Sequence, residues 1–160
     1  MNKNQKWQTG DFTISTEHDK LDIKLIHHYL TTETYWAQER SLDVVARSFK
    51  NSLPFVILRG TETVGWARVV SDYATFAWLA DVFIRREFRG LGLSKWLMET
   101  ILAHPDLQNL RRFLLATRDA HSLYSQYGFE KLKIPQLWME RTAKNAYASF
   151  GIEEDDFEQK

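Results

Sequence analysis

Hydrophobic residues recur at spacings of three and four positions in two early segments of the chain, a period typical of amphipathic helices. The first series is Ile23, Ile26 and Leu30. The second series is Leu42, Val45, Ala46 and Phe49. Asp19 and Asp22 precede the first series, where carboxylates suit the positive end of a helix, and Ser41 precedes the second as a favourable N-cap. The pattern therefore predicts two helices, the second of which ends near Asn51 and Pro54.

Three apolar runs follow the second helix, and each is short and bounded by turn residues. They span residues 54–58, 64–70 and 76–84, with turns at 60–62 and 71–73 between them. Because β-branched and aromatic residues are frequent in these runs, we predict three consecutive strands of an antiparallel meander. The third run is nearly all apolar, so we expect it to be buried on both faces.

The second half of the chain alternates between helical and strand patterns. A helix opens after Gly90-Leu91-Gly92, and the apolar run at 113–116 indicates a buried strand. Asp119 is placed to cap a short helix, which Gly128 ends. The last two predicted strands are 129–132 and 137–140. Helices, an antiparallel meander and a β-α-β-α-β run together indicate an α/β (α+β) fold, a single-domain mixed sheet with helices on both faces.

The composition limits the classes of protein to which the chain can belong. It has 160 residues, of which 44% are apolar, so a single domain with a sizeable core fits and a disordered chain does not. We assign this domain to residues 1–150 and interpret the acidic residues 151–160 as a solvated tail. The 21 basic and 21 acidic residues give a formal net charge of zero, which argues against a general nucleic-acid binder.

The absence of cysteine and of long apolar stretches excludes further classes of protein. The chain has no cysteine, which excludes disulfides, thiol catalysis and cysteine-based zinc sites. No stretch approaches the roughly 18 apolar residues of a membrane span, and the polar N-terminus lacks the apolar region of a signal peptide. We therefore expect a cytoplasmic protein without a membrane partner.

A glycine-containing turn between the third strand of the meander and the next helix is suited to bind an anion. In Arg89-Gly90-Leu91-Gly92-Leu93-Ser94, the glycines let the backbone approach a phosphate, and the amides of the helix start point toward it. Arg86 and Arg89 add positive charge nearby. The segment also fits a plain tight turn, and it lacks the lysine of a P-loop and the third glycine of a dinucleotide fingerprint. A generic binder of nucleotide phosphates is therefore one alternative.

A second signature follows in Ala120-His121-Ser122-Leu123-Tyr124-Ser125-Gln126-Tyr127-Gly128-Phe129. Together with the glycine turn and one strand between them, it resembles the GNAT superfamily of acyl-CoA-dependent N-acyltransferases. That family has an Arg/Gln-x-x-Gly-x-Gly/Ala turn after its fourth strand and an Ala-x-x-Leu-Tyr-x-x-x-Gly-Phe segment in a later helix. The resemblance covers roughly residues 55–132 and implies a GNAT-like domain that uses acetyl-CoA as its co-substrate.

The resemblance also implies which residues bind coenzyme A. Backbone amides for the pyrophosphate would come from Leu91, Gly92, Leu93 and the small Ser94. Arg89 and Gly90 would shape the turn, while Phe83 and Ile84 would pair their backbone with the pantetheine arm. Thr117 stands where many members have an Asn that contacts pantetheine, so only its hydroxyl is available to replace that contact.

Tyr124 matches the family tyrosine near the thioester sulfur, and the resemblance implies that it protonates the leaving thiolate. Its place on the apolar stripe of a short helix also fits a core residue. Tyr35 and Trp36, between the two N-terminal helices, lie in a stretch that commonly walls the acceptor site in the family. They are equally compatible with a plain hydrophobic contact.

Asp81 is the exception in the otherwise apolar third strand of the meander. A buried carboxylate must be hydrogen-bonded or paired, because burying a bare charge is costly. Asp81 either pairs with Arg68 on the neighbouring strand or faces the acceptor cleft, where it would hold or deprotonate the amine. Both residues are therefore candidates for the acceptor side.

We predict an enzyme that transfers an acetyl group from acetyl-CoA to a primary amine of a small molecule or peptide by direct attack. Backbone amides of the central strand would polarise the carbonyl oxygen, and a base or an ordered water would remove the amine proton. This chemistry needs no metal. The alternative is a non-catalytic acyl-CoA sensor or scaffold domain, and a homodimer is implied by the resemblance alone.

Overall fold

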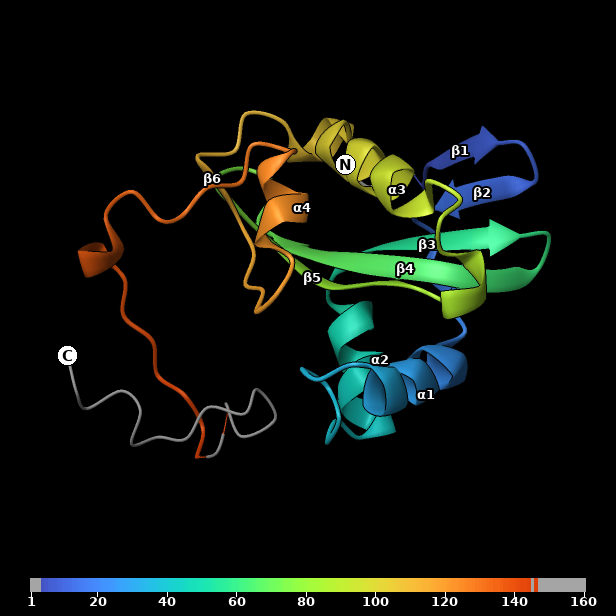
Figure 1. Cartoon of the computed structure of the whole chain (residues 1–160), viewed down its shortest axis with the longest axis horizontal. Coiled ribbons are helices and arrows are strands. Elements are labelled where there is room, and N and C mark those ends of the chain that lie inside the picture. The colour runs from blue at the N-terminus through green and yellow to red at the C-terminus, as the bar shows by residue number, and fades with distance from the viewer. Residues whose placement is uncertain (1–3, 145, 147–160) are drawn as a thin grey trace.

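One six-stranded sheet runs through the computed structural model, which describes residues 4–144 and 146 (Figure 1). The strands are β1 (Lys6–Thr9), β2 (Phe12–Ser15), β3 (Leu53–Arg59), β4 (Glu62–Ser71), β5 (Phe76–Ile84) and β6 (Arg112–Leu114). Their order in the sheet follows the chain. All neighbours pair antiparallel except β5 and β6, which are parallel. The predicted meander of β3, β4 and β5 is confirmed.

Helices cover both faces of this sheet (Figure 1). The α-helices of the described residues are α1 (Ile23–Glu33), α2 (Leu42–Lys50), α3 (Leu93–Leu102) and α4 (His121–Ser125). α1 and α2 lie on one face, and α3 and α4 lie on the other. Two predicted caps form: Asp22 Oδ1 accepts a hydrogen bond from the Leu25 amide at 3.0 Å, and Ser41 Oγ accepts from the Val44 amide at 3.3 Å. The predicted mixed sheet with helices on both faces is confirmed.

Each face of the sheet buries its own hydrophobic core. The core beneath α3 includes Phe55, Ile57, Leu97, Met98 and Ile101. The core beneath α1 and α2 includes Ile26, Leu30, Val45, Phe49, Trp66 and Phe83. Full burial of one such side chain contributes about 1.5–3 kcal/mol, so both cores hold β4 and β5 firmly between two helical layers.

The hairpin of β1 and β2 is absent from the sequence-based prediction. Thr9 pairs with Phe12 across a two-residue turn at Gly10 and Asp11. Gly10 has a φ of 54°, which lies in the region that glycine favours. Phe12 and Ile14 alternate with polar residues after this Gly-Asp pair, and Trp7 is flanked by polar residues before it, so the sequence contains a hairpin signal.

The prediction of two final strands is wrong for the described residues. Residues 129–132 and 137–140 form no strand, and a short 3-10 turn, η4 (Pro135–Leu137), interrupts an irregular segment. Pro135 has no amide hydrogen to give to a ladder, and β6 is only three residues long, so the edge offers few partners. The tail predicted for 151–160 lies outside the described residues.

The predicted cap of the last helix is also wrong. Ala120, not Asp119, is the N-cap of α4, and no side chain caps that position. Thr117 Oγ1 instead accepts a hydrogen bond from the Ala120 amide at 3.0 Å, which satisfies a donor just before the helix. Gly128 has a φ of 83° after the helix and ends it as predicted.

His104 is a buried titratable group at the end of α3. It is 1% exposed, and its ring packs against those of Trp7 and Phe55, with centroids 6.0 and 5.6 Å away. Its Nδ1 accepts a hydrogen bond from the Asp106 amide at 3.2 Å, which requires a neutral nitrogen at that position. Burial lowers the pKa of His104, and the charge of Asp106 opposes this shift only partly.

We expect acid to destabilise the fold through His104. The unfolded chain takes up a proton near the ordinary histidine pKa of about 6.5, whereas the folded chain resists protonation until a lower pH. The stability contributed by His104 is therefore complete above about pH 6.5 and is lost as the pH falls toward the lowered folded pKa, by at most about 1.4 kcal/mol per pH unit. Urea unfolding of the parent and His104→Leu between pH 5 and 8 measures this slope.

The matched control is His28→Gln, since His28 is exposed on α1. We expect His104→Leu to flatten the acid slope and His28→Gln to leave it unchanged. Equal slopes in the parent and His104→Leu would contradict the assignment.

Candidate functional site

Only the first part of β5 is paired on its β6 side. The parallel register joins β6 to Phe76, Ala77 and Trp78. From Leu79 to Ile84, β5 keeps β4 on one side and has no strand on the other within the described residues. Unpaired backbone groups of a strand edge are able to bind an extended ligand. Phe83 and Ile84, the predicted partners of pantetheine, lie at the end of this open edge.

The turn after β5 leads into α3. Gly90 and Gly92 have φ angles of 81° and 78°, in the left-handed region. A Cβ atom added to either glycine meets no atom within 4 Å, so the space outside the turn is open. Gly92 is the N-cap of α3, and the free amides of the first turn carry the positive end of the helix dipole. This geometry suits the anion that the sequence motif predicts.

Arg89 connects the turn to the end of β5. Its Nε donates a hydrogen bond to the carbonyl of Ile84 at 2.9 Å, and its guanidinium lies 5.5 Å from the centre of the Phe83 ring. The side chain therefore folds back over the strand and stabilises the shape of the turn. Leu91 is 59% exposed at the tip, whereas Leu93 is buried and Ser94 half-buried at the start of α3.

Tyr124 lies on α4 and packs at the margin of the core beneath α3. Its ring meets Phe129 edge-on, with centroids 6.1 Å apart. Burial raises the pKa of the Tyr124 phenol, and the nearby Tyr35 and Asp119 raise it further. The hydroxyl is therefore protonated at neutral pH and can donate a proton.

The segment between α1 and α2 reaches the loop that precedes α4. The Tyr35 hydroxyl accepts a hydrogen bond from the Arg118 amide at 2.9 Å, and the Arg118 guanidinium lies 3.9 Å from the centre of the Tyr35 ring. Tyr35 and Trp36 pack edge-on with centroids 5.0 Å apart. His27 Nε2 lies 2.9 Å from the carbonyl oxygen of Arg40, which ties the end of the segment to α1.

Asp81 lies at a shift in the register between β4 and β5 and has a φ of 53°. Its carboxylate is 1% exposed. Trp36 Nε1 donates to Oδ1 at 3.0 Å, and Arg40 Nη1 donates to both oxygens at 2.8 and 3.0 Å. Arg68 Nε donates to Oδ2 at 2.5 Å. The predicted pair with Arg68 is therefore present, and Arg40 is a second cation that no local pattern in the sequence indicates.

These contacts make one cluster from elements that are distant in the sequence. Tyr124 lies within electrostatic range of Tyr35, which packs on Trp36, and Trp36 binds Asp81. We call these residues the acceptor cluster, after the acceptor-side role that the family resemblance implies for this region; they are Tyr35, Trp36, Arg40, Arg68, Asp81 and Tyr124. No hydrogen bond joins Thr117 to these residues within the part of the chain that the structure describes, and its hydroxyl oxygen accepts a hydrogen bond from the Ala120 amide just before α4. Arg40 and Arg118 carry no periodicity signal, and only the fold brings them to this place.

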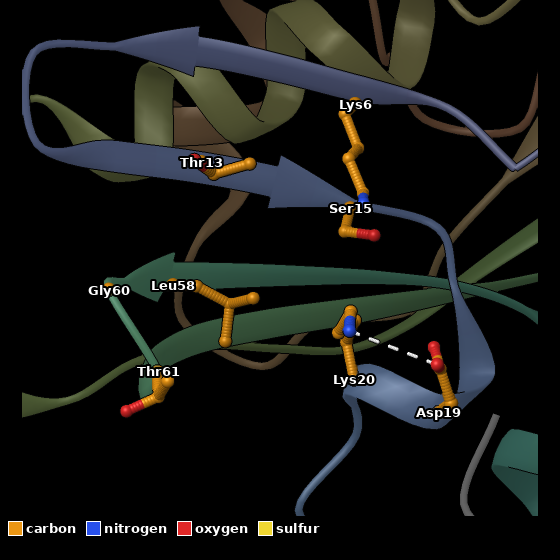
Figure 2. A pocket seen from close by; sticks show the side chains of 8 residues that line it. All are labelled: Lys6, Thr13, Ser15, Asp19, Lys20, Leu58, Gly60 and Thr61. Atoms are coloured by element: carbon orange, nitrogen blue, oxygen red, sulfur yellow. Dashed lines mark ion pairs between the residues drawn. The ribbon is translucent and has the colours of Figure 1, made fainter.

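Other features of the described residues lie away from the acceptor cluster. A hollow of about 440 Å³ lies between β1, β2, the β3–β4 turn and the 3-10 turn η1 (His18–Lys20). Figure 2 shows the side chains that line it. Its lysines already face acids: Lys6 pairs with Glu17 at 2.8 Å and Lys20 with Asp19 at 3.8 Å. In the part of the chain that the structure describes, no helix is long and apolar enough to cross a membrane.

Comparisons with known proteins give one consistent result. Residues 23–129 match the family model described as the acetyltransferase (GNAT) family. A protein from Xanthomonas campestris pv. campestris with a crystal structure, described as belonging to the GNAT family, has 48% sequence identity to this chain. The two structures match with a TM-score of 0.83 over 88% of this chain and 99% of that one. A protein of Gibberella zeae that is named as an acetyltransferase by inference has 28% sequence identity to this chain. The match covers 78% of this chain and 81% of that protein. A structure of a protein from Deinococcus radiodurans shares the fold, with a TM-score of 0.66 and 16% sequence identity. The match covers 89% of this chain and 96% of that one.

Proposed function

The chain belongs to the GNAT acetyltransferase family, and from this premise we propose that it transfers an acetyl group from acetyl-CoA to a primary amine of a small molecule or peptide. The observation that carries the proposal is the open glycine turn at the start of α3, next to the unpaired edge of β5. A phosphate bound at the turn and an extended arm along the edge together fit coenzyme A. The homodimer implied by the resemblance stays a prediction.

In this proposal the turn and the strand edge bind the two halves of coenzyme A. The backbone amides of Leu91, Gly92, Leu93 and Ser94 receive the pyrophosphate. Arg89 and Gly90 keep the turn in shape, and the backbone of Phe83 and Ile84 pairs with pantetheine along the open edge. Thr117 contributes its hydroxyl, whose oxygen already accepts one hydrogen bond from the Ala120 amide and whose hydrogen can donate to pantetheine.

The chemistry is a direct attack. The amine nitrogen bonds to the thioester carbonyl carbon, the carbon–sulfur bond breaks, and backbone amides of β5 stabilise the charge on the carbonyl oxygen. Tyr124 donates its proton to the departing sulfur, and its raised pKa keeps the phenol protonated until that step. The amine proton leaves to water, and a proton from water restores the Tyr124 phenol before the next turnover.

Asp81 takes a positioning role in this proposal. Its two oxygens already accept four hydrogen bonds from Trp36, Arg40 and Arg68, so an amine would have to displace one of these donors to reach them. The carboxylate instead holds Trp36 and Arg40 in place beside the acceptor. Tyr35, Trp36 and Arg68 remain the proposed acceptor-binding residues.

The experiment that tests the function measures free thiol. The protein is incubated with acetyl-CoA and a panel of primary amines, and we expect thiol release that depends on both the protein and the amine. Tight binding of coenzyme A without release for any amine would favour the non-catalytic sensor or scaffold. Calorimetric preference for ATP over coenzyme A would indicate a generic nucleotide-phosphate binder instead.

We expect Gly92→Asp to weaken coenzyme A binding by well over tenfold, about 1.4 kcal/mol or more. The new carboxylate enters the open space outside the turn, where the pyrophosphate is proposed to lie, and its charge repels the phosphates. Isothermal titration with coenzyme A measures the change.

Gly10→Asp is the matched control, because Gly10 also has a positive φ of 54° and open space around its Cβ position, but lies in the β1–β2 turn. It should strain the backbone in a similar way and leave coenzyme A affinity unchanged. Parental affinity in Gly92→Asp would mean that the anion binds elsewhere.

A further inference from the structure

The acceptor cluster contains more positive than negative charge. Arg40 and Arg68 converge on a single carboxylate, that of Asp81, with N–O distances of 2.8 and 2.5 Å. Two guanidiniums and one carboxylate leave a formal charge of +1. Because the Asp81 side chain is 1% exposed, water does little to screen this group from its neighbours.

Both guanidiniums have N–H groups that donate no hydrogen bond to another described residue. Arg40 uses Nη1 for Asp81, and Arg68 uses Nε for Asp81 and Nη1 for Ser52 at 3.2 Å. Among the described residues, Arg40 Nε and Nη2 and Arg68 Nη2 have no hydrogen-bond acceptor. The Arg40 side chain is 28% exposed and that of Arg68 is 13% exposed, so Arg40 is the one that a ligand reaches first.

Among the residues that the structure describes, the neighbouring acids do not cancel this excess. Asp119 is 62% exposed and lies 3.7 Å from Arg118, whose guanidinium covers the Tyr35 ring. Glu39, the neighbour of Arg40, is exposed. Exposed carboxylates are screened by water and salt within about 10 Å, whereas the partly buried guanidiniums are screened less. The electrostatic potential that the described residues create at the cluster is therefore positive.

Building on the proposed function, we propose that the acceptor amine carries an anionic oxygen group, a carboxylate or a phosphate, which binds the free N–H donors of Arg40 and Arg68. A planar guanidinium fork suits both groups, because each presents two oxygens. The same positive field disfavours the protonated form of the amine and so favours the neutral form that attacks the thioester. Polyamines and other acceptors with only positive charges are disfavoured by the same field.

The test compares matched amines that differ in one anionic group. The carboxylate arm compares β-alanine with its amide, and the phosphate arm compares phosphoethanolamine with ethanolamine. We expect the anionic member of at least one pair to have a kcat/KM at least tenfold higher, and the arm that responds identifies the group. Arg40→Gln should reduce this preference by about tenfold, mainly through KM, because it removes a charge-assisted hydrogen bond to the anionic group.

Two control variants make the result specific. Arg40→Lys keeps the charge without the fork and should retain an intermediate preference. Arg47→Gln removes an exposed arginine of α2 that lies outside the cluster, and it should leave the preference unchanged. Wild-type protein that acetylates the neutral member of both pairs as well as the anionic member would overturn the inference and leave the proposed function standing.

A binding measurement separates failure of the inference from failure of the function. With coenzyme A present at saturation, inorganic phosphate or propionate should raise the melting temperature of the parent and of Arg47→Gln, and raise that of Arg40→Gln much less. This result without any acetyl transfer would support the anion site and contradict the proposed function. The absence of any difference between the parent and Arg40→Gln in this measurement would contradict the anion site.

Discussion

Asp81→Asn will destabilise the folded protein by about 3–5 kcal/mol, because it removes the only negative charge from a buried group with two guanidiniums. Asn keeps the size of the side chain and tolerates the positive φ of 53°, so the lost charge is the main change. Arg40 and Arg68 would then face a neutral amide and, at 28% and 13% exposure, regain only part of their hydration. Urea unfolding with linear extrapolation measures the loss.

A surface pair supplies the control for Asp81→Asn. Asp19 is 75% exposed and lies 3.8 Å from Lys20, so Asp19→Asn should cost less than about 1 kcal/mol. The positioning role also predicts that the remaining folded Asp81→Asn protein binds coenzyme A normally. A variant of parental stability whose turnover is lost would instead return Asp81 to the role of the base.

Tyr124→Phe should lower kcat by about 100-fold, near the low end of what general acid catalysis contributes. The substitution removes one hydroxyl and keeps the ring that packs against Phe129 and the core beneath α3. Solvent water can protonate a thiolate in part, because thiols have a pKa near about 8.5, and this limits the effect. The Michaelis constants should change little, since the acid acts in the transition state.

The alkaline limb of the kcat profile gives an independent readout. Because the pKa of Tyr124 is raised, its acid form persists above the ordinary tyrosine value of about 10, and kcat should fall only above that pH. Tyr124→Phe should lack this fall. Tyr127→Phe is the control, since Tyr127 lies just after α4 and outside the acceptor cluster. Full activity of Tyr124→Phe where chemistry limits the rate would leave Tyr124 as a packing residue.

Local signals in the sequence were sufficient for the elements that frame the site. The three-and-four spacing beginning at Ile23 and Leu42 places α1 and α2, and the side chains of Asp22 and Ser41 accept the hydrogen bonds expected of caps. The apolar runs of β3, β4 and β5 and the glycine turn before α3 are also visible in short windows. Each of these features depends on residues within a few positions of one another, so backbone geometry alone makes them readable.

Close packing between neighbouring strands, in contrast, cannot be read from short stretches of the sequence. At Gly65 an added Cβ would lie 2.7 Å from Ile84 Cδ1 and 2.9 Å from the carbonyl oxygen of Phe83. The glycine is therefore required by a neighbour on the next strand, and nothing around position 65 in the sequence indicates it. The strands predicted at 129–132 and 137–140 do not form, although their sequences have a β-type pattern. Such a pattern forms a strand only where a sheet edge is available to pair with it.

The sequence by itself determined the order of the elements, the glycine turn and the family signature, because these are local patterns. The tertiary structure decided which polar side chains meet. Arg40 and Asp81 are 41 positions apart, and Tyr35 and Arg118 are 83 apart, yet each pair is in hydrogen-bond contact. Such contacts depend on how the α1–α2 segment crosses β5 and the loop before α4, which the two hydrophobic cores determine. The excess positive charge of the acceptor cluster is therefore a property of the fold, since no stretch of the sequence contains it.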